Sequence, residues 1–92
     1  MKYHLRATTA YVKDYKKAVK HHLPIGKLQA VVAKLANGEA LPHQNKDHAL
    51  SGNLIGLRDC HIESDWVLLY FYSTADELVL TLTDTGTHAD LF

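Results

Sequence analysis

Two segments that lie far apart in this 92-residue chain are rich in side chains that exchange protons. Residues 85–92 place His88 and the aromatic Phe92 directly after an apolar run and a Thr-Gly turn. A terminal segment usually frays unless packing holds it, and a frayed tail rarely needs these two residues. We therefore expect residues 85–92 to fold against a second polar segment, residues 47–66, and to complete one site with it.

Within the second segment, one predicted strand carries a carboxylate and a histidine two residues apart. Asp59 and His61 share one strand face, so the carboxylate can orient the imidazole or raise its pKa, whereas Arg58 points to the opposite face. Histidine acts as acid and as base near neutral pH, and RNA carries its own nucleophile, the 2′-hydroxyl. A histidine site therefore suits RNA cleavage, although an isolated pair of this kind is also typical of surface charges beside a turn. The residues suited to proton transfer are His48, Asp59, His61, Asp65 and His88.

Other chemistries find less support in the sequence. Metal-ligand types are present, but they are scattered along the chain without a His-x-x-x-His or Cys-x-x-Cys motif, so we expect no metal and no cofactor. Strand parity places Cys60 opposite Asp59, which predicts a small core residue rather than a nucleophile. The scattered metal-ligand types are His43, Asp47, His48, His61 and His88.

Composition predicts one domain spanning residues 1–92, with a single modest core. No apolar run approaches the roughly 18 residues of a membrane span. The N-terminus lacks a secretory signal, and the one cysteine fits a reducing compartment, so we expect a cytoplasmic protein.

The net charge of zero conceals a strong segregation of charge. Residues 1–34 carry eight lysines and arginines against Asp14 alone, a formal charge of +7, whereas residues 35–92 carry two against nine acids, a charge of −7. Such a basic half fits contact with phosphate or with an acidic partner. The alternative is that the lysines only solvate two amphipathic helices.

Hydrophobic periodicity predicts the elements that position the site. Residues 2–7 read as a strand, and Thr8 or Thr9 can cap the helix that follows. Leu23-Pro24 ends this helix, and Asn37-Gly38 ends a second one, so the two helices must be antiparallel. The expected apolar stripes are Val12, Tyr15, Val19 and His22 on the first helix, and Ile25, Leu28, Val31, Val32 and Leu35 on the second.

The rest of the chain reads as a loop and a sheet. Residues 37–53 are polar and contain Gly and Pro, and strand patterns follow at about 54–62, 66–72 and 77–83. Short turns between these strands imply antiparallel hairpins. We predict an α+β fold of order β-α-α-β-β-β, with two antiparallel helices on one face of an antiparallel sheet and the other face free for a ligand.

Three motifs then become specific. After Leu41-Pro42, the string DHALSG at 47–52 resembles the pattern DHxLxG of the YafQ branch of RelE-like bacterial toxins. GLRDCHIESDW at 56–66 resembles GxRDxHIxPDW of that branch, and TGTHADLF at 85–92 resembles its TGTHxxLF. The resemblance covers the chain in order and length, and the predicted element order agrees with the RelE-like fold.

This resemblance implies a type II toxin, a ribosome-dependent endoribonuclease that cuts mRNA in the ribosomal A site and is neutralised by a cognate antitoxin. Motif position marks four catalytic residues, with His88 as the main acid or base, and leaves the separate tasks of the histidines open. Phe92 would stack on a base. The implied catalytic residues are His48, His61, Asp65 and His88, and Asp59 and Phe92 match supporting positions. We add Lys46 and Arg58 as candidate substrate contacts because of their positive charge.

Two departures from the family pattern bear on activity. Asp84 stands where the family has an arginine before the Thr-Gly pair, and losing one donor to a developing charge costs about 10²–10³ in rate. Ser64 replaces the proline of the turn, which loosens that turn. We predict a weak or context-restricted nuclease. The alternatives are a silent homologue that only binds antitoxin, and a ParE-like inhibitor of gyrase, which would not need three histidines.

Overall fold

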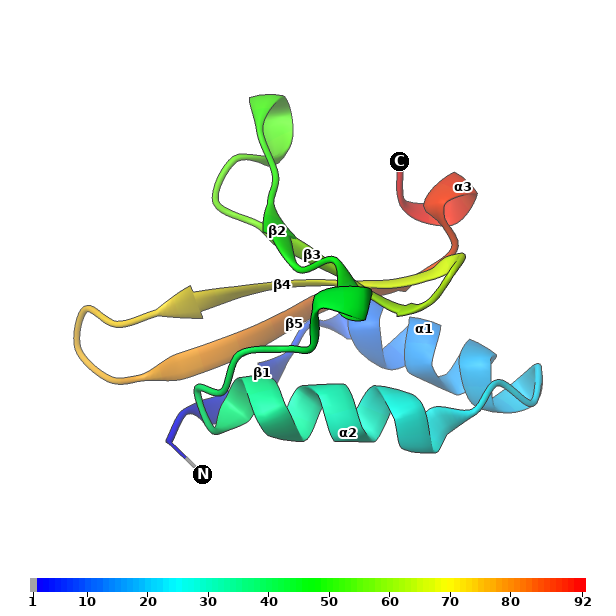
Figure 1. The fold of residues 1–92 in the computed structure, drawn as a ribbon, viewed down its shortest axis with the longest axis horizontal. Helices are drawn as coiled ribbons and strands as arrows, with labels where there is room; N and C mark the ends of the chain where they lie inside the picture. Colours follow the sequence, from blue (N-terminus) through cyan, green and yellow to red (C-terminus); the bar gives the residue numbers. More distant parts are fainter. Residues whose placement is uncertain (1) are drawn as a thin grey trace.

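Helices and strands follow one another in the order that the sequence predicts, with a few short elements added. In the computed structural model, which describes residues 2–92, two long helices lie on one side of a five-stranded sheet (Figure 1). The strands are β1 (His4–Ala7), β2 (His48–Ala49), β3 (Arg58–Glu63), β4 (Trp66–Ser73) and β5 (Val79–Gly86). The helices are α1 (Thr9–Lys20), α2 (Ile25–Ala36) and α3 (His88–Leu91), and two 3-10 turns are η1 (His43–Asn45) and η2 (Gly52–Leu54).

The sheet has the strand order β1-β5-β4-β3-β2. Strands β2 to β5 pair antiparallel, as their short connections predict. One pairing differs from the expected antiparallel sheet: β1 runs parallel to β5, with His4 opposite Val79. No hairpin sets the direction of β1, because both long helices intervene before the chain re-enters the sheet. The predicted α+β order is confirmed, and β2 is an additional two-residue strand inside the expected loop.

The buried face of α1 consists of Tyr11 and Ala18. The predicted stripe through Val12 and Val19 is wrong by one position, since 41% of Val12 and 50% of Val19 is exposed. Asp14 accounts for the error because its carboxylate accepts a hydrogen bond from a backbone N–H of β5 at 3.1 Å. A polar residue with a partner on the inward side interrupts the apolar pattern on which a periodicity argument depends.

The start of α1 and the end of α2 match their sequence signals, whereas α1 ends at Lys20, before the predicted Leu23-Pro24, and His22 lies beyond it with a left-handed φ of 59°. The Thr8 hydroxyl accepts a hydrogen bond from the Tyr11 N–H at 3.0 Å and caps α1. After α2, Gly38 has a φ of 73°, the left-handed conformation that glycine adopts without strain. Figure 1 shows α1 and α2 running in opposite directions on the same side of the sheet, as expected.

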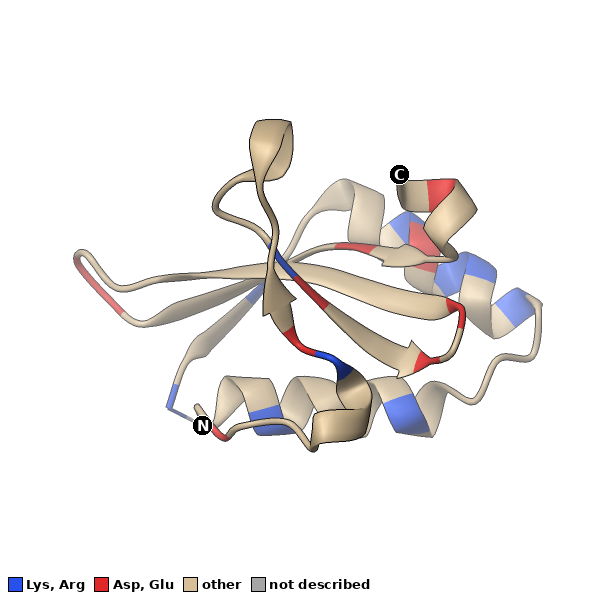
Figure 2. Cartoon of the chain, turned by 45° about the horizontal axis from the view of Figure 1, so that its top comes forward, with Lys and Arg blue, Asp and Glu red and all other residues tan. Residues whose placement is uncertain are grey.

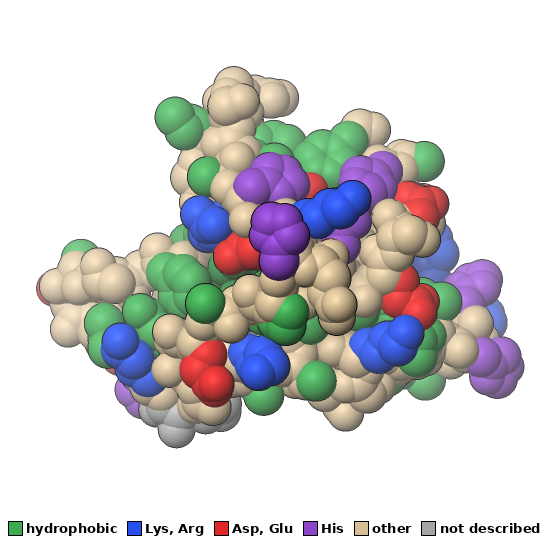
Figure 3. All heavy atoms as spheres, viewed as in Figure 1, with side chains coloured by type: hydrophobic (Ala, Val, Ile, Leu, Met, Phe, Trp, Pro, Cys, Tyr) green, Lys and Arg blue, Asp and Glu red, His purple; other side chains and the backbone are tan. Residues whose placement is uncertain are grey.

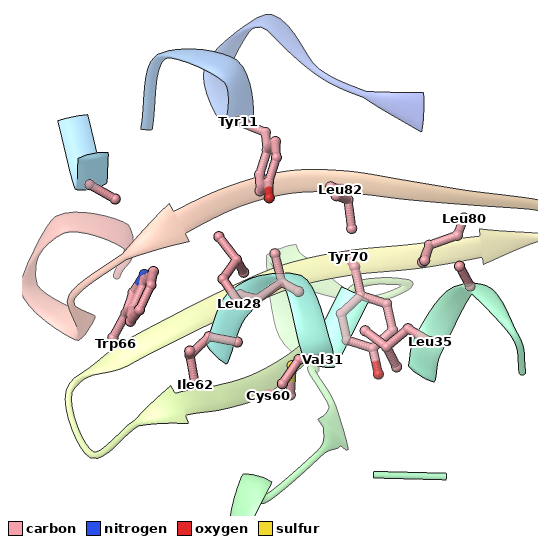
Figure 4. Packing of buried hydrophobic residues seen from close by; sticks show 13 residues of the cluster. Tyr11, Leu28, Val31, Leu35, Cys60, Ile62, Trp66, Tyr70, Leu80 and Leu82 are labelled. Carbon is pink, nitrogen blue, oxygen red and sulfur yellow. The ribbon is translucent and has the colours of Figure 1, made fainter. Parts of the chain in front are cut away.

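The core lies between this helical layer and the sheet (Figure 4). Leu28 and Leu35 of α2 meet Leu68 and Tyr70 of β4, and all four are almost fully buried. Cys60 is also fully buried, and burial raises the pKa of its thiol, so the prediction of a core residue is confirmed. The sheet is thereby fixed in place against α2, and its opposite face remains available for a site.

Two segments rise from the opposite side of the sheet, the loop between β2 and β3 and the short helix α3 (Figure 1). The loop contains η2, and α3 follows directly on the end of β5. Within residues 2–92, none of the helices has the length and apolar character needed to cross a membrane.

Candidate active site

Helix α3 begins with a reciprocal cap that sets the position of its first residue, His88. The Thr87 hydroxyl accepts from the Asp90 N–H at 3.1 Å, and the Asp90 carboxylate accepts from the Thr87 N–H at 3.2 Å. This capping box holds residues 87–90 as a helical turn instead of a frayed tail. The expectation that the C-terminal segment is ordered is therefore confirmed.

His88 and Asp65 form a close pair across the site. The Nδ1 atom of His88 lies 2.9 Å from the Asp65 carboxylate, and the backbone N–H of His88 donates to the same oxygen at 3.2 Å. These hydrogen bonds, the side-chain one foremost, hold the pKa of Asp65 below its ordinary range. An ionised carboxylate on Nδ1 leaves the other ring nitrogen, Nε2, available to a substrate.

Two more rings gather around His88. The ring centres of His61 and His88 are 5.0 Å apart, and Phe92 stacks on His88 with its centre 6.0 Å away and an angle of 28° between the rings. Phe92 is 55% exposed, so it presents an aromatic surface at the rim of the site. Space-filling Figure 3 shows histidines gathered at the foot of the β2–β3 loop and toward α3.

Asp59 lies beneath these rings as a buried carboxylate. Its Oδ2 atom is 3.9 Å from Nε2 of His48, the residue opposite it on β2, and within the described part of the chain its Oδ1 atom has no hydrogen-bond partner. Ligand atoms of Asp59, His61 and His88 lie within 4.8 Å of one another, a geometry that could hold a metal ion. The sequence prediction that Asp59 and His61 share a face is confirmed, whereas the expectation of no metal stays a prediction.

His48 projects from the two-residue strand β2, with half of its side chain exposed. Its Nδ1 atom lies 2.6 Å from the backbone carbonyl of Lys46. Lys46 adopts a left-handed conformation with a φ of 48°, which turns the chain between η1 and β2. A carbonyl oxygen only accepts hydrogen bonds, so Nδ1 of His48 carries the proton and Nε2 is unprotonated in the neutral ring.

Arg58 occupies a separate cluster on the other face of β3, as strand parity predicts. Its Nε atom lies 3.3 Å from the Asp47 carboxylate and 3.4 Å from the Tyr70 hydroxyl, and this hydroxyl donates to Asp47. The hydrogen bond with Tyr70 is the largest of the interactions that raise the pKa of Arg58. The structure therefore does not bring Arg58 together with the histidines, although it was a predicted substrate contact.

Asn45 and Tyr70 also support the site, and sequence reasoning assigned neither a role there. The buried Asn45 amide donates to the backbone carbonyl of His61 at 2.6 Å and joins η1 to β3. No motif marked Asn45, because it lies in a polar segment that reads as a loop. Tyr70 lies inside an apolar strand, where its hydroxyl carries no sequence signal.

An ion pair lies beside the turn that carries Ser64. The Lys27 Nζ atom of α2 is 2.9 Å from the Glu63 carboxylate at the end of β3.

Asp84, the residue in place of the family's arginine, lies against α1. Burial, followed by the nearby Asp14 carboxylate, raises the pKa of Asp84. Both carboxylates line a cavity of about 670 Å³ beneath α3, together with Lys17 and Trp66. Asp84 therefore lies close to a second carboxylate, that of Asp14, which disfavours its ionised form.

Comparison with known proteins identifies the family of this chain. The family model described as the bacterial toxin YafQ of type II toxin–antitoxin systems matches residues 3–92. The mRNA interferase toxin YafQ of Escherichia coli strain K12 is 45% identical over 83 residues, which are 89% of this chain and 87% of that protein.

Solved structures of related toxins share the fold of this chain. A crystal structure of the E. coli DinJ–YafQ toxin–antitoxin complex superposes with a TM-score of 0.86 at 39% identity, covering 100% of this chain and 99% of that one. A metal-bound toxin from Helicobacter pylori superposes with a TM-score of 0.91 at 33% identity, covering 98% and 99%. The chain therefore belongs to the YafQ family of bacterial toxins of type II toxin–antitoxin systems.

Proposed function

We propose that this chain is an endoribonuclease that cuts mRNA in the ribosomal A site by histidine acid–base catalysis. The observation that carries the proposal is the pairing of His88 with Asp65 at 2.9 Å, next to His61 and Phe92. Its E. coli relative is named an mRNA interferase. The catalytic residues in this proposal are His48, His61, Asp65 and His88.

The hydrogen bonds of His48 and His88 suit opposite roles in proton transfer, base and acid. His48 holds its proton on Nδ1 against the Lys46 carbonyl, so its Nε2 atom accepts the proton of the RNA 2′-hydroxyl. The 2′-oxygen then attacks phosphorus, and the bond to the 5′-oxygen breaks. Asp65 holds the His88 ring through Nδ1, and His88, when protonated, donates its Nε2 proton to the leaving 5′-oxygen. The products are a 2′,3′-cyclic phosphate and a 5′-hydroxyl.

The remaining site residues fit substrate contact. His61, 5.0 Å from His88 between ring centres, would contact the phosphate, and the exposed ring of Phe92 would stack on a base. Lys46 would supply positive charge beside His48. Since Arg58 is engaged with Asp47 and no arginine stands at position 84, we expect cleavage to be slow.

The basic face of α1 fits ribosomal RNA. Figure 2 shows lysines along α1 and α2, and one of them, Lys27 of α2, pairs with Glu63 of β3 at 2.9 Å. Four lysines lie on α1, and phosphate contacts of this kind make binding strongly dependent on salt. The ribosome would align the substrate, which a site this small cannot do alone. These lysines are Lys13, Lys16, Lys17 and Lys20.

We further propose that an antitoxin binds the helical side. A groove of about 550 Å³ between α1 and α2 is lined by apolar side chains, among them Val12 and Val32, with Lys16 at its edge. This surface fits the apolar face of an acidic amphipathic segment. Val32→Glu should weaken antitoxin binding by at least about tenfold and leave cleavage intact, whereas equal binding would place the antitoxin elsewhere.

The deciding experiment is mRNA cleavage on programmed ribosomes with an open A site. We expect cuts by the native chain, cyclic phosphate ends on the products, and no cuts by His88→Ala. His4→Ala is the matched control, because His4 lies on the exposed strand β1. If the native chain cuts nothing, Asp84→Arg is tested next; continued silence would contradict the nuclease and favour a protein that only binds antitoxin.

A further inference from the structure

His48 belongs to a strand that is too short to hold a side chain in place alone. Strand β2 has two residues, pairs His48 with Asp59 and Ala49 with Arg58, and is followed by one further backbone hydrogen bond, from the Leu50 N–H to the Leu57 carbonyl at 2.9 Å. Isolated pairing of this length is marginal in water. A base must nevertheless be held at hydrogen-bond distance from the proton that it removes. The support for His48 must therefore come from outside β2.

The residue before His48 is anchored in the core. Tyr70, in the middle of β4, is fully buried, and its hydroxyl donates a hydrogen bond to the Asp47 carboxylate. Arg58 lies 3.3 Å from the same carboxylate oxygen. Burial raises the pKa of the Tyr70 hydroxyl, which keeps it a hydrogen-bond donor at physiological pH. Asp47 is thus held by two donors, one of them from the fully buried middle of β4.

This anchor reaches the His48 ring through the backbone. Lys46 and Asp47 are consecutive, so fixing the Asp47 side chain also fixes the Lys46 carbonyl, which lies 2.6 Å from Nδ1 of His48. Lys46 is in the left-handed region, where a residue with a Cβ is held only by surrounding contacts. Release of Asp47 would let Lys46 relax to an ordinary conformation and turn its carbonyl away from the ring.

We propose that Tyr70 and Asp47 are positioning residues that hold His48 in the tautomer with Nε2 unprotonated, acting through the Lys46 carbonyl. The importance of this tautomer for cleavage rests on the proposed function. The tautomer can be tested without that function, because the hydrogen bond between His48 and the Lys46 carbonyl is present without substrate.

The test is the tautomer of His48, read by nuclear magnetic resonance from the ¹⁵N shifts of its ring nitrogens above the pKa of the ring. We expect the native chain to carry the proton on Nδ1. Tyr70→Phe and Asp47→Ala should move much of the population to the Nε2–H form, and Asp47→Asn, which keeps an acceptor, should restore part of the native pattern. His88 serves as the internal reference.

Tyr72→Phe is the matched control. Tyr72 is a tyrosine two positions farther along β4, and its hydroxyl donates to the Leu35 carbonyl at 2.8 Å, away from β2. We expect this variant to lose a comparable hydrogen bond and keep the native His48 tautomer. A native tautomer in Tyr70→Phe, or an equal change in Tyr72→Phe, would overturn the proposal.

Cleavage supplies a second, separate measurement. Tyr70→Phe should lower kcat roughly 10- to 100-fold with little change in KM, because a misplaced base affects the chemical step more than binding. Tyr72→Phe should cut at the native rate. A native kcat in Tyr70→Phe despite an altered tautomer would contradict the role of His48 as base and leave the positioning device intact.

Discussion

The Asp14 carboxylate accepts a hydrogen bond from the backbone N–H of Thr85 at 3.1 Å and so joins α1 to β5 beyond the end of β1. The neighbouring Asp84 is forced close to this carboxylate, and both line the cavity beneath α3. The hydrogen bond that joins α1 to β5 therefore brings the carboxylates of Asp14 and Asp84 close together.

Asp84→Asn should stabilise the protein near neutral pH. The raised pKa of Asp84 means that the folded state holds this proton more tightly than the unfolded chain does. Its favourable contribution is complete below the ordinary pKa of about 4 and is lost as pH rises through the raised value. The asparagine removes the charge, so Tm from circular dichroism should rise near pH 7 and stay close to native near pH 3.5. Asp76→Asn, in the exposed turn after β4, is the control; an equal rise there would contradict the explanation.

Asp65→Asn should lower kcat by about 10²–10³, because His88 loses the carboxylate that holds its ring at Nδ1. A pH–rate profile of the variant and of the native protein measures this loss. The interaction itself should disappear in acid, since the depressed Asp65 pKa makes it complete above about pH 4 and lost as pH falls further. An unchanged profile would separate Asp65 from the chemistry.

Thr87→Ala should disorder α3 and reduce cleavage. Loss of a cap costs about 1 kcal/mol of helix stability, which is large for a helix of four residues. Hydrogen exchange at the amides of residues 90–92 should accelerate, since these donate to residues 87 and 88. Thr8→Ala removes the equivalent cap from α1 and should lower Tm without lowering kcat. Equal losses of kcat in both variants would point to general destabilisation.

Zinc should inhibit the toxin, and removal of metal should not. Asp59, His61 and His88 offer ligand atoms within 4.8 Å of one another, and a bound ion would occupy nitrogens that the proposed chemistry needs. We expect a toxin stripped with EDTA, desalted and added to ribosomes to keep its full rate. Added Zn²⁺ should inhibit it, and Asp59→Asn should weaken this inhibition. Loss of activity on stripping, restored by zinc, would instead indicate a metal-dependent nuclease.

Motif spacing and strand parity are local properties, so the sequence predicted which strand face the candidate residues of β3 occupy. Asp59 and His61 share a face, and Arg58 points away from them, as alternation along a strand requires. The parallel pairing of β1 was not predictable in this way, since no turn links it to β5. Asn45 was missed for a similar reason: it contacts His61, which lies 16 residues away in the sequence.

The error on α1 has a different origin. Val12 and Val19 have the spacing of a buried stripe, yet both are exposed, and the helix is turned so that Asp14 reaches β5. The rotation of the helix buries Tyr11 and Ala18 instead and turns Asp14 toward β5. Periodicity alone contains no information on such a partner.

The position of β5 between β1 and β4 has a consequence for folding. β1 finds its partner only across most of the chain, and the Thr8 hydroxyl reaches the Thr83 carbonyl over a separation of 75 residues. Closing so long a loop is slow, and its entropic cost is offset only when β5 is available to pair with β1. During synthesis, the helices would therefore form without a sheet to cover them, and their apolar faces would remain in water. The toxin should gain both its protease resistance and its activity in one late step, when β5 inserts and brings α3 to the histidines.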